Sequence, residues 1–228
     1  MHGSGTSILA EVLDASGLFL GVDAEHHESS FFREEVAELV LGREDRWAEL
    51  PLPGVEEVLS FVPEARARIE AGWLARYRAL GYDGASPWGF KDPRSCVILP
   101  LYLAIFPGAR VLHIVRSADD VAASLARRRK RGVGRLRDAA HWRRLARAYV
   151  ERVRACAREL PGRYLEVAYE PFCREPVRVS AGIFDFVGIA FGPDAQRLVA
   201  ERVHDHAIGS AERSALSDRL RALVRGRR

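Results

Sequence analysis

The chain has 228 residues and a formal net charge of +4, a length that suits one domain with a substantial buried core. No run approaches the ~18 apolar residues of a membrane span. The first residues also lack the basic stretch and apolar core of a signal peptide, so we expect a cytoplasmic protein. Cys96, Cys156 and Cys173 have no metal-binding spacing and form no C-x-x-C pair, which favours reduced thiols and no bound metal.

The first part of the chain is predicted to be mainly helical. Apolar residues that recur on one face predict a helix over 4–16 and another over 31–41. Residues 22–30 and 43–54 are polar or rich in Pro and Gly, so we expect loops there. Helical periodicity returns over 55–80.

Strands then alternate with helices. The predicted strands are 88–91, 110–115 and 163–168, and the second is an almost continuous apolar run of the kind buried in a parallel sheet. The predicted helices are 95–106, 119–131, 138–160, 176–187, 193–204 and 211–225. This alternation predicts an α/β fold whose parallel β-sheet, of about four or five strands, is flanked by helices. We expect one domain over 1–228, with a core over about 2–188 and a C-terminal helical segment over 189–228.

Three groups of polar residues lie at predicted strand ends or helix starts. The small-residue turn 3–7 opens a helix, where free N–H groups and the helix dipole bind anions. Arg116 ends a strand and Ser124 lies on the next helix, so a guanidinium fork and a hydroxyl are offered to a phosphate. Lys91 follows another strand. Each group also has an ordinary explanation: a terminal tag, a capping arginine with a helix serine, and surface ion pairing.

Together these segments resemble successive motifs of the sulfotransferases, including bacterial members, which use 3′-phosphoadenosine 5′-phosphosulfate (PAPS). The matching segments are Ser4-Gly5-Thr6-Ser7, Lys91-Asp92-Pro93-Arg94, Phe106-Pro107-Gly108-Ala109-Arg110, His113-Ile114-Val115-Arg116, Asp120-Val121-Ala122-Ala123-Ser124-Leu125 and Val167-Ala168-Tyr169-Glu170-Pro171-Phe172. The resemblance implies a three-layer architecture like that of the P-loop NTPases. It also implies PAPS as co-substrate, with no metal needed.

The resemblance assigns a role to each candidate residue. The turn would hold the 5′-phosphosulfate with Gly3, Ser4, Gly5, Thr6 and Ser7. Arg116 and Ser124 would hold the 3′-phosphate, and Tyr169 would lie near the nucleotide. Lys91 would lie beside the group that is transferred, where cations stabilise charge on the equatorial oxygens.

A general base is expected in the polar segment 22–30, before the second predicted helix. Glu28, followed by two residues and Phe31-Phe32, resembles the E-x-x-F-F segment that carries the catalytic glutamate of heparan sulfotransferases. A carboxylate within reach of a hydroxyl can take its proton, so Glu28 is the first candidate and His27 the second. A solvated loop that leads into a helix cap is the alternative. Pro93 stands where cytosolic sulfotransferases carry a histidine.

Two departures from the family pattern keep other functions open. Relatives carry Lys or Arg where this chain has Gly3, and in relatives a central strand precedes the turn, so the first strand is expected to be missing or truncated. These departures favour a degenerate, non-catalytic nucleotide-binding or interaction protein. A P-loop phosphotransferase is a further alternative, although the chain lacks the G-K-[ST] motif.

The expected acceptor is a hydroxyl or amine on a small molecule or carbohydrate. Nucleic acid is not expected, because the basic run 127–137 lacks the interleaved aromatic residues that stack bases.

Overall fold

A computed structural model of the chain describes residues 5–23, 27–42, 46–129 and 137–203. Within these ranges, two parallel strands lie at the centre, β1 (Val111–Val115) and β2 (Tyr164–Ala168). Their register pairs Val111 with Tyr164 and Val115 with Ala168. Both strands were predicted, and the parallel α/β class is confirmed.

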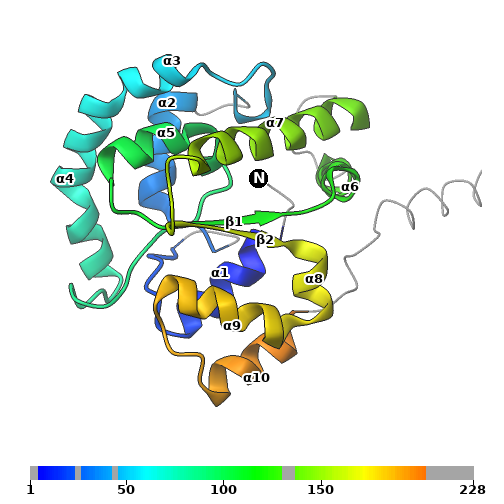
Figure 1. Cartoon of the computed structure of the whole chain (residues 1–228). Helices are drawn as coiled ribbons and strands as arrows, with labels where there is room; N and C mark the ends of the chain where they lie inside the picture. Colours follow the sequence, from blue (N-terminus) through cyan, green and yellow to red (C-terminus); the bar gives the residue numbers. More distant parts are fainter. Residues whose placement is uncertain (1–4, 24–26, 43–45, 130–136, 204–228) are drawn as a thin grey trace, which may run out of the picture.

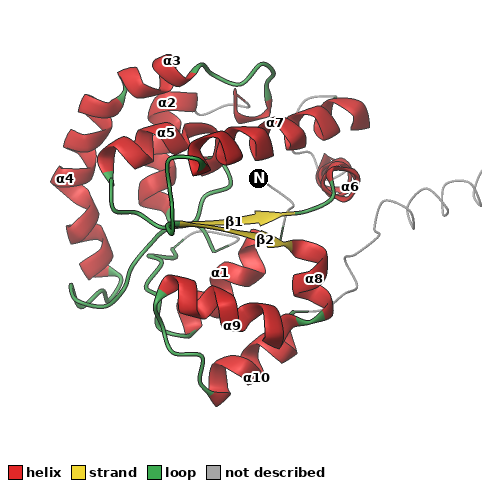
Figure 2. Ribbon diagram, viewed as in Figure 1, coloured by secondary structure: helices red, strands yellow, loops and turns green. Residues whose placement is uncertain are grey.

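Helices cover both faces of the two strands (Figures 1 and 2). On one side lie α1 (Thr6–Ala15), α8 (Tyr169–Arg174), α9 (Pro176–Val187) and α10 (Pro193–Arg202). The other side carries the π-helical η1 (Phe32–Ala37), α2 (Glu38–Leu41), the short 3-10 helix η2 (Arg46–Ala48), α3 (Val55–Ser60), α4 (Val62–Ala79), α5 (Ser95–Ile105) and α7 (Ala139–Ala157). Helix α6 (Ala118–Arg129) follows the carboxyl end of β1 and packs on α7.

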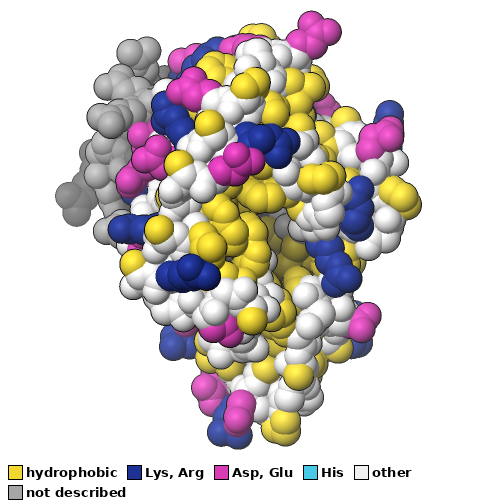
Figure 3. Space-filling model, turned by 90° about the vertical axis from the view of Figure 1, so that its left-hand side faces the viewer, with side chains coloured by type: hydrophobic (Ala, Val, Ile, Leu, Met, Phe, Trp, Pro, Cys, Tyr) yellow, Lys and Arg dark blue, Asp and Glu magenta, His cyan; other side chains and the backbone are white. Residues whose placement is uncertain are grey.

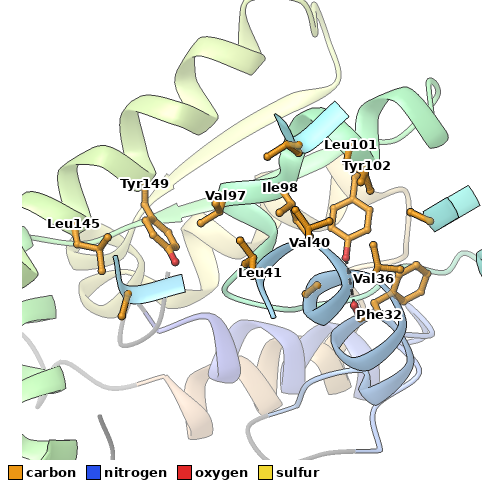
Figure 4. Packing of buried hydrophobic residues seen from close by; sticks show 14 of the residues in the cluster. Phe32, Val36, Val40, Leu41, Val97, Ile98, Leu101, Tyr102, Leu145 and Tyr149 are labelled. Carbon is orange, nitrogen blue, oxygen red and sulfur yellow. Dashed lines mark hydrogen bonds between the residues drawn. The ribbon is translucent and has the colours of Figure 1, made fainter. Parts of the chain in front are cut away.

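The larger hydrophobic core lies among η1, α4, α5 and α7 (Figure 4). Helix α5 is apolar on nearly all sides, as expected for a helix enclosed by others, and its Val97, Ile98 and Leu101 are fully buried. Phe32 stacks on Phe90 with ring centroids 3.8 Å apart. Truncating such a buried aromatic to alanine costs about 3–5 kcal/mol, so this core anchors the helical layer.

A second core joins α1 to the opposite face of the strands. Leu9, Val12 and Leu13 of α1 are buried in one cluster with Ile114 of β1 and Val167 of β2. Because α1 is held this way, its amino terminus has a fixed position relative to the ends of both strands.

The sheet is smaller than predicted within the described residues. The predicted strand 88–91 forms only an isolated parallel bridge, between Trp88 and Phe19. Among the described residues it does not pair with β1, and both segments line the same apolar cavity. A hollow with hydrophobic walls is visible on the face of the molecule where β1 begins (Figure 3). The expectation of four or five strands is therefore wrong for the described part of the chain, which has two.

The predicted helices that lie in the described residues are present, with some of them subdivided, whereas α8 and the short η2 were not predicted. The predicted helix 31–41 is a π-helix followed by one α-helical turn, and 55–80 is divided at Phe61. Helix α5 is kinked at Ile98, just before Pro100. The predicted helix 211–225 lies outside the described residues. None of the described helices is long and apolar enough to cross a membrane.

Candidate functional site

The amino terminus of α1 lies against the carboxyl end of β2. Gly5, the residue before α1, has φ 90°, a conformation that favours glycine. A Cβ at this position would lie 2.1 Å from Cε2 of Tyr169, the first residue after β2. The turn can therefore approach the tyrosine ring this closely only because residue 5 has no side chain.

Arg116 joins this contact from the carboxyl end of β1. Its guanidinium carbon lies 4.7 Å from the centroid of the Tyr169 ring, a cation–π distance. Its Nη2 lies 3.8 Å from Oδ2 of Asp120, and both side chains are only 5% exposed. A cation with so little exposure needs anionic or aromatic neighbours. Gly5, Tyr169 and Arg116 thus form one continuous contact.

A further hydrogen bond ties the ends of the two strands together. The Ser117 N–H donates to Oε1 of Glu170 at 3.0 Å, so the turn after β1 is held to the start of α8. Burial raises the pKa of the Tyr169 hydroxyl above its usual range, which keeps this group neutral beside the guanidinium.

Ser124 is half-buried on α6, four residues after Asp120. Residues four apart share a helix face, so Ser124 lies one turn beyond the carboxylate that pairs with Arg116. The structure therefore places Ser124 on the helix face that carries Asp120, the carboxylate partner of Arg116.

Lys91 links the first turn of α1 to Glu28. Its ammonium nitrogen lies 3.3 Å from Oε1 of Glu28 and 3.5 Å from Oγ of Ser7. The Lys91 and Glu28 side chains are only 12% and 10% exposed. This places a cation, a carboxylate and the amino-terminal turn of α1 together in a sheltered position.

The turn after Lys91 is held rigidly by a buried ion pair. Arg94 donates through Nε and Nη2 to the carboxylate of Asp92, at 3.0 and 2.6 Å, and its N–H donates to the same carboxylate at 2.8 Å. The Asp92 side chain is fully buried. Such bidentate pairs fix geometry as well as charge, so the backbone that carries Lys91 has little freedom.

His27 and Glu28 are neighbours in sequence but have different partners. His27, with φ 55°, lies with its Nε2 3.6 Å from Oε2 of Glu11 on α1. Glu11 also pairs with Arg202 of α10 at 3.3 Å. The structure thus brings Glu28 to Lys91 and turns the His27 ring toward α1 and α10. Gly3 and Ser4 lie outside the described residues.

Sequence reasoning did not single out Asp120 or Glu170. Asp120 follows Arg116 by four residues at the start of a helix, a spacing that predicts an ion pair. Glu170 lies within the matching segment 167–172, but this pattern does not indicate its partner Ser117, which is far away in the sequence. The described residues contain no group of three or more His, Cys, Asp or Glu that could hold a metal ion.

The two parallel strands of this α/β protein end beside the amino terminus of a helix, with the little-exposed cations Lys91 and Arg116 next to it. Open α/β sheets commonly bind their ligands at this end of the strands. The family model described as Sulfotransferase family matches residues 1–193. The chain therefore belongs to the sulfotransferase family. No curated protein and no solved structure gives a significant match.

Proposed function

We propose that the chain transfers a sulfuryl group from PAPS to a hydroxyl or amine on a small-molecule or carbohydrate acceptor. The observation that carries this proposal is Lys91, whose ammonium lies between Ser7 at the helix terminus and the Glu28 carboxylate. A cation there is available both to an anion at the turn and to the carboxylate that would accept a proton. Family membership supports sulfuryl transfer as the reaction class.

In the proposed reaction, the acceptor oxygen or nitrogen attacks the sulfur in line with the leaving nucleotide. The bond between sulfur and the bridging oxygen breaks, and its electron pair leaves with 3′-phosphoadenosine 5′-phosphate. Glu28 takes the acceptor's proton, while Lys91 and the N–H groups at the α1 terminus stabilise the charge on the equatorial oxygens. A sulfuryl group at the turn would compete with Glu28 for the Lys91 ammonium, so donor binding would release the carboxylate to act as base.

Arg116 would bind the 3′-phosphate in this proposal. Its guanidinium is held between Tyr169 and Asp120 at the strand end, which fixes its direction before the nucleotide arrives. Such preorganisation lowers the entropy lost on binding. Ser124, one turn beyond Asp120, would add a hydroxyl donor.

The nucleotide site is tested by calorimetric titration with 3′-phosphoadenosine 5′-phosphate. We expect micromolar binding that Arg116→Ala weakens at least tenfold, about 1.4 kcal/mol. The matched control is Arg110→Ala. Arg110 lies just before β1, the strand that Arg116 follows, and its guanidinium donates to the Phe186 carbonyl at 2.7 Å. Arg110→Ala should leave the affinity within twofold. Absence of binding by folded wild-type protein would overturn the proposal.

A second candidate is a non-catalytic nucleotide-binding protein, favoured by Gly3 at the position where relatives carry a cation. This candidate predicts nucleotide binding without turnover, even after Gly3→Arg. An assay of nucleotide release from PAPS separates the two candidates. The chain is incubated with PAPS and phenols, sugars or amines, and chromatography measures the released nucleotide. Turnover that Gly3→Arg increases would support the enzyme.

A further inference from the structure

The three residues Glu28, Ser29 and Ser30 form a buried polar run ahead of η1. None of them is more than 8% exposed, and buried polar groups need hydrogen-bond partners. Glu28 has Lys91 as a partner at 3.3 Å, and the Tyr77 hydroxyl lies 3.5 Å from the Ser29 hydroxyl. Because Glu28 is the proposed base, whatever holds this run also sets the position of its carboxylate.

Asp23 makes hydrogen bonds on both sides of Glu28 along the chain. Its N–H donates to the Glu28 carbonyl at 3.3 Å. Its Oδ1 accepts from the Ser30 N–H at 2.7 Å, and its Oδ2 accepts from the Ser30 hydroxyl at 2.6 Å. These bonds tie Asp23 to the backbone at Glu28 and again two residues later. The peptide that carries the Glu28 side chain therefore has little freedom to rotate.

Arg76 of α4 fixes the direction of the Asp23 carboxylate. Its Nε donates to Oδ2 of Asp23 at 3.1 Å, and its Nη2 donates to the Ser30 hydroxyl at 3.2 Å. The Asp23 side chain is only 9% exposed, whereas that of Arg76 is half-exposed. Burial raises the pKa of the Asp23 carboxyl, but the hydrogen bonds from Ser30 and Arg76 outweigh this effect, so the pKa lies below its usual value. Asp23 is therefore a charged acceptor with a fixed orientation.

The same helix also holds the segment that carries Lys91. Tyr77, next to Arg76, is fully buried, and its hydroxyl donates to the Gly89 carbonyl at 2.9 Å. Gly89 lies two residues before Lys91. Two consecutive residues of α4 thus hold the two segments, one through Asp23 and the other through Gly89. Because α4 is anchored in the larger core, it sets the distance between the proposed base and the ammonium.

Building on the proposed role of Glu28 as base, we infer that Asp23 is a positioning residue that holds the Glu28 carboxylate at the Lys91 ammonium. Asp23 itself is poorly placed to take a proton from an acceptor, because Ser30 and Arg76 donate to its two oxygens. Its effect on the reaction therefore passes through Glu28. Such an effect can be large, since a displacement of about 1 Å can cost about 10²-fold in rate.

The chain offers a matched control in Asp83. Its Oδ1 accepts from the Ser86 N–H at 2.8 Å and its Oδ2 from the Ser86 hydroxyl at 2.6 Å, so it makes the same pair of bonds to a serine as Asp23 does. Asp83 is exposed. In either residue, replacement by asparagine leaves only one oxygen to accept. Only Asp23→Asn, however, loosens the loop that carries Glu28.

Transfer kinetics test whether Asp23 acts through Glu28. Asp23→Asn should lower kcat about 10- to 100-fold. The KM for PAPS should stay within about twofold, because the residues that would hold the nucleotide lie on other elements. Asp83→Asn should change neither constant. In a Glu28→Gln background, Asp23→Asn should cause no further loss, because no base is left to position; an equal loss in both backgrounds would overturn the inference.

A measurement without PAPS tests the position of the carboxylate directly. The chain has two lysines, Lys91 and Lys130, so NMR of protein with isotope-labelled lysine gives two side-chain amine signals, and Lys91→Arg identifies one of them by its loss. Glu28→Gln should shift the Lys91 signal, because the ammonium loses its charged neighbour. Asp23→Asn should shift this signal in the same direction, and Asp83→Asn should leave it unchanged.

A Lys91 signal that moves with Glu28→Gln but not with Asp23→Asn would overturn the inference. A signal that Glu28→Gln leaves unchanged would do so too, since the ion pair would then be absent. If Asp23→Asn does not fold, Ser30→Ala removes only the serine hydroxyl that bonds to Asp23, and it must shift the signal in the same direction for the inference to hold. Expected shifts in a chain that transfers no sulfuryl group would uphold the positioning and sink the proposed function, so the two failures are distinguishable.

Discussion

Lys91 owes its position to an ion pair in the turn that follows it. The Asp92–Arg94 ion pair fixes the turn, and the turn directs the Lys91 ammonium between Ser7 and Glu28. Glu28 lies one residue from His27, yet only Glu28 has the ammonium as a partner, whereas His27 pairs with Glu11. At the scale of single residues, the carboxylate is therefore the better-placed proton acceptor.

Glu28→Gln tests this assignment. The variant keeps the size of the side chain but cannot take a proton, so the rate of PAPS-dependent transfer should fall by about 10²–10⁴. Affinity for 3′-phosphoadenosine 5′-phosphate should be unchanged or tighter, because Lys91 loses its competing carboxylate. Transfer rates and calorimetric affinities measure the two effects separately.

The control for this prediction is Glu11→Gln, which removes the carboxylate that pairs with His27 and Arg202. This variant should transfer at nearly the wild-type rate. Transfer that survives in Glu28→Gln and disappears in Glu11→Gln would instead assign the base to the His27–Glu11 pair.

Gly5→Ala should destabilise the turn before α1 through two effects. The residue has φ 90°, which strains any other side chain, and the added Cβ would lie 2.1 Å from Tyr169. Gly17→Ala is a close control, since Gly17 has φ 103° but nothing within 4 Å of the added Cβ. We expect Gly5→Ala to lower the free energy of unfolding by about 1–3 kcal/mol more than Gly17→Ala. Urea denaturation measures this difference. Equal losses of unfolding free energy in the two variants would show that the Tyr169 ring moves aside at little cost.

At the scale of elements, α7 compensates for the kink in α5. The helix loses its regular geometry at Ile98, and Arg152 of α7 donates to the Val97 carbonyl at 3.1 Å beside this kink. The same guanidinium donates to the Pro53 carbonyl at 2.6 Å. One side chain therefore joins α7, α5 and the loop before α3, which explains how an apolar helix with an internal proline is held in the core.

Arg152→Met should reveal this role. Methionine preserves most of the apolar stem but leaves two carbonyl groups without the guanidinium, which costs about 1–3 kcal/mol. Arg147→Met, on the same helix but with an exposed side chain, serves as the control and should change stability by less than about 0.5 kcal/mol. Thermal and urea unfolding of both variants decide the matter, and equal stability of the two would contradict the bridging role.

At the scale of the whole molecule, the two strands separate the two hydrophobic cores. Ile114 belongs to the core shared with α1, whereas the neighbouring His113 side chain points to the opposite face. There its Nδ1 lies 3.0 Å from the Tyr164 hydroxyl, and Glu166, held by Arg154, lies 3.9 Å away. Burial lowers the pKa of His113 to about 4.

This histidine makes the folded state sensitive to acid. The unfolded chain binds a proton at His113 near pH 6.5, whereas the folded chain does so only near pH 4. The stability contribution is therefore fully present above pH 6.5 and is lost as the pH falls toward 4. It amounts to about 2–3 kcal/mol.

Urea unfolding from pH 7 to pH 4 should show this loss, and His113→Gln should remove most of it. Glu166 has its pKa lowered to about 2, chiefly by its hydrogen bonds with Arg154, so its own contribution is lost at lower pH, as the pH falls from about 4.5 toward 2. An unchanged pH dependence in His113→Gln would show that other groups govern acid unfolding.

Short-range patterns in the sequence were sufficient for most of the elements and for the family. The apolar run ending at Val115 predicted β1, the periodicity over 176–187 predicted α9, and the ordered motifs predicted the sulfotransferase family that the family model confirms. These features depend on neighbouring residues only, whose spacing and propensities are local properties. The roles of Glu28, Lys91, Arg116, Ser124 and Tyr169 in binding and catalysis stay predictions.

Only the tertiary structure decided which distant residues meet. Glu28 rather than His27 contacts Lys91, and the Tyr169 ring lies against Gly5. Residues 87–90 do not pair with β1, and both segments line one apolar cavity. No local pattern encodes these outcomes, because each depends on how two helical layers pack around the strands. The sequence by itself determined which polar residues stand at the strand ends, whereas packing decided which of them lie close to one another.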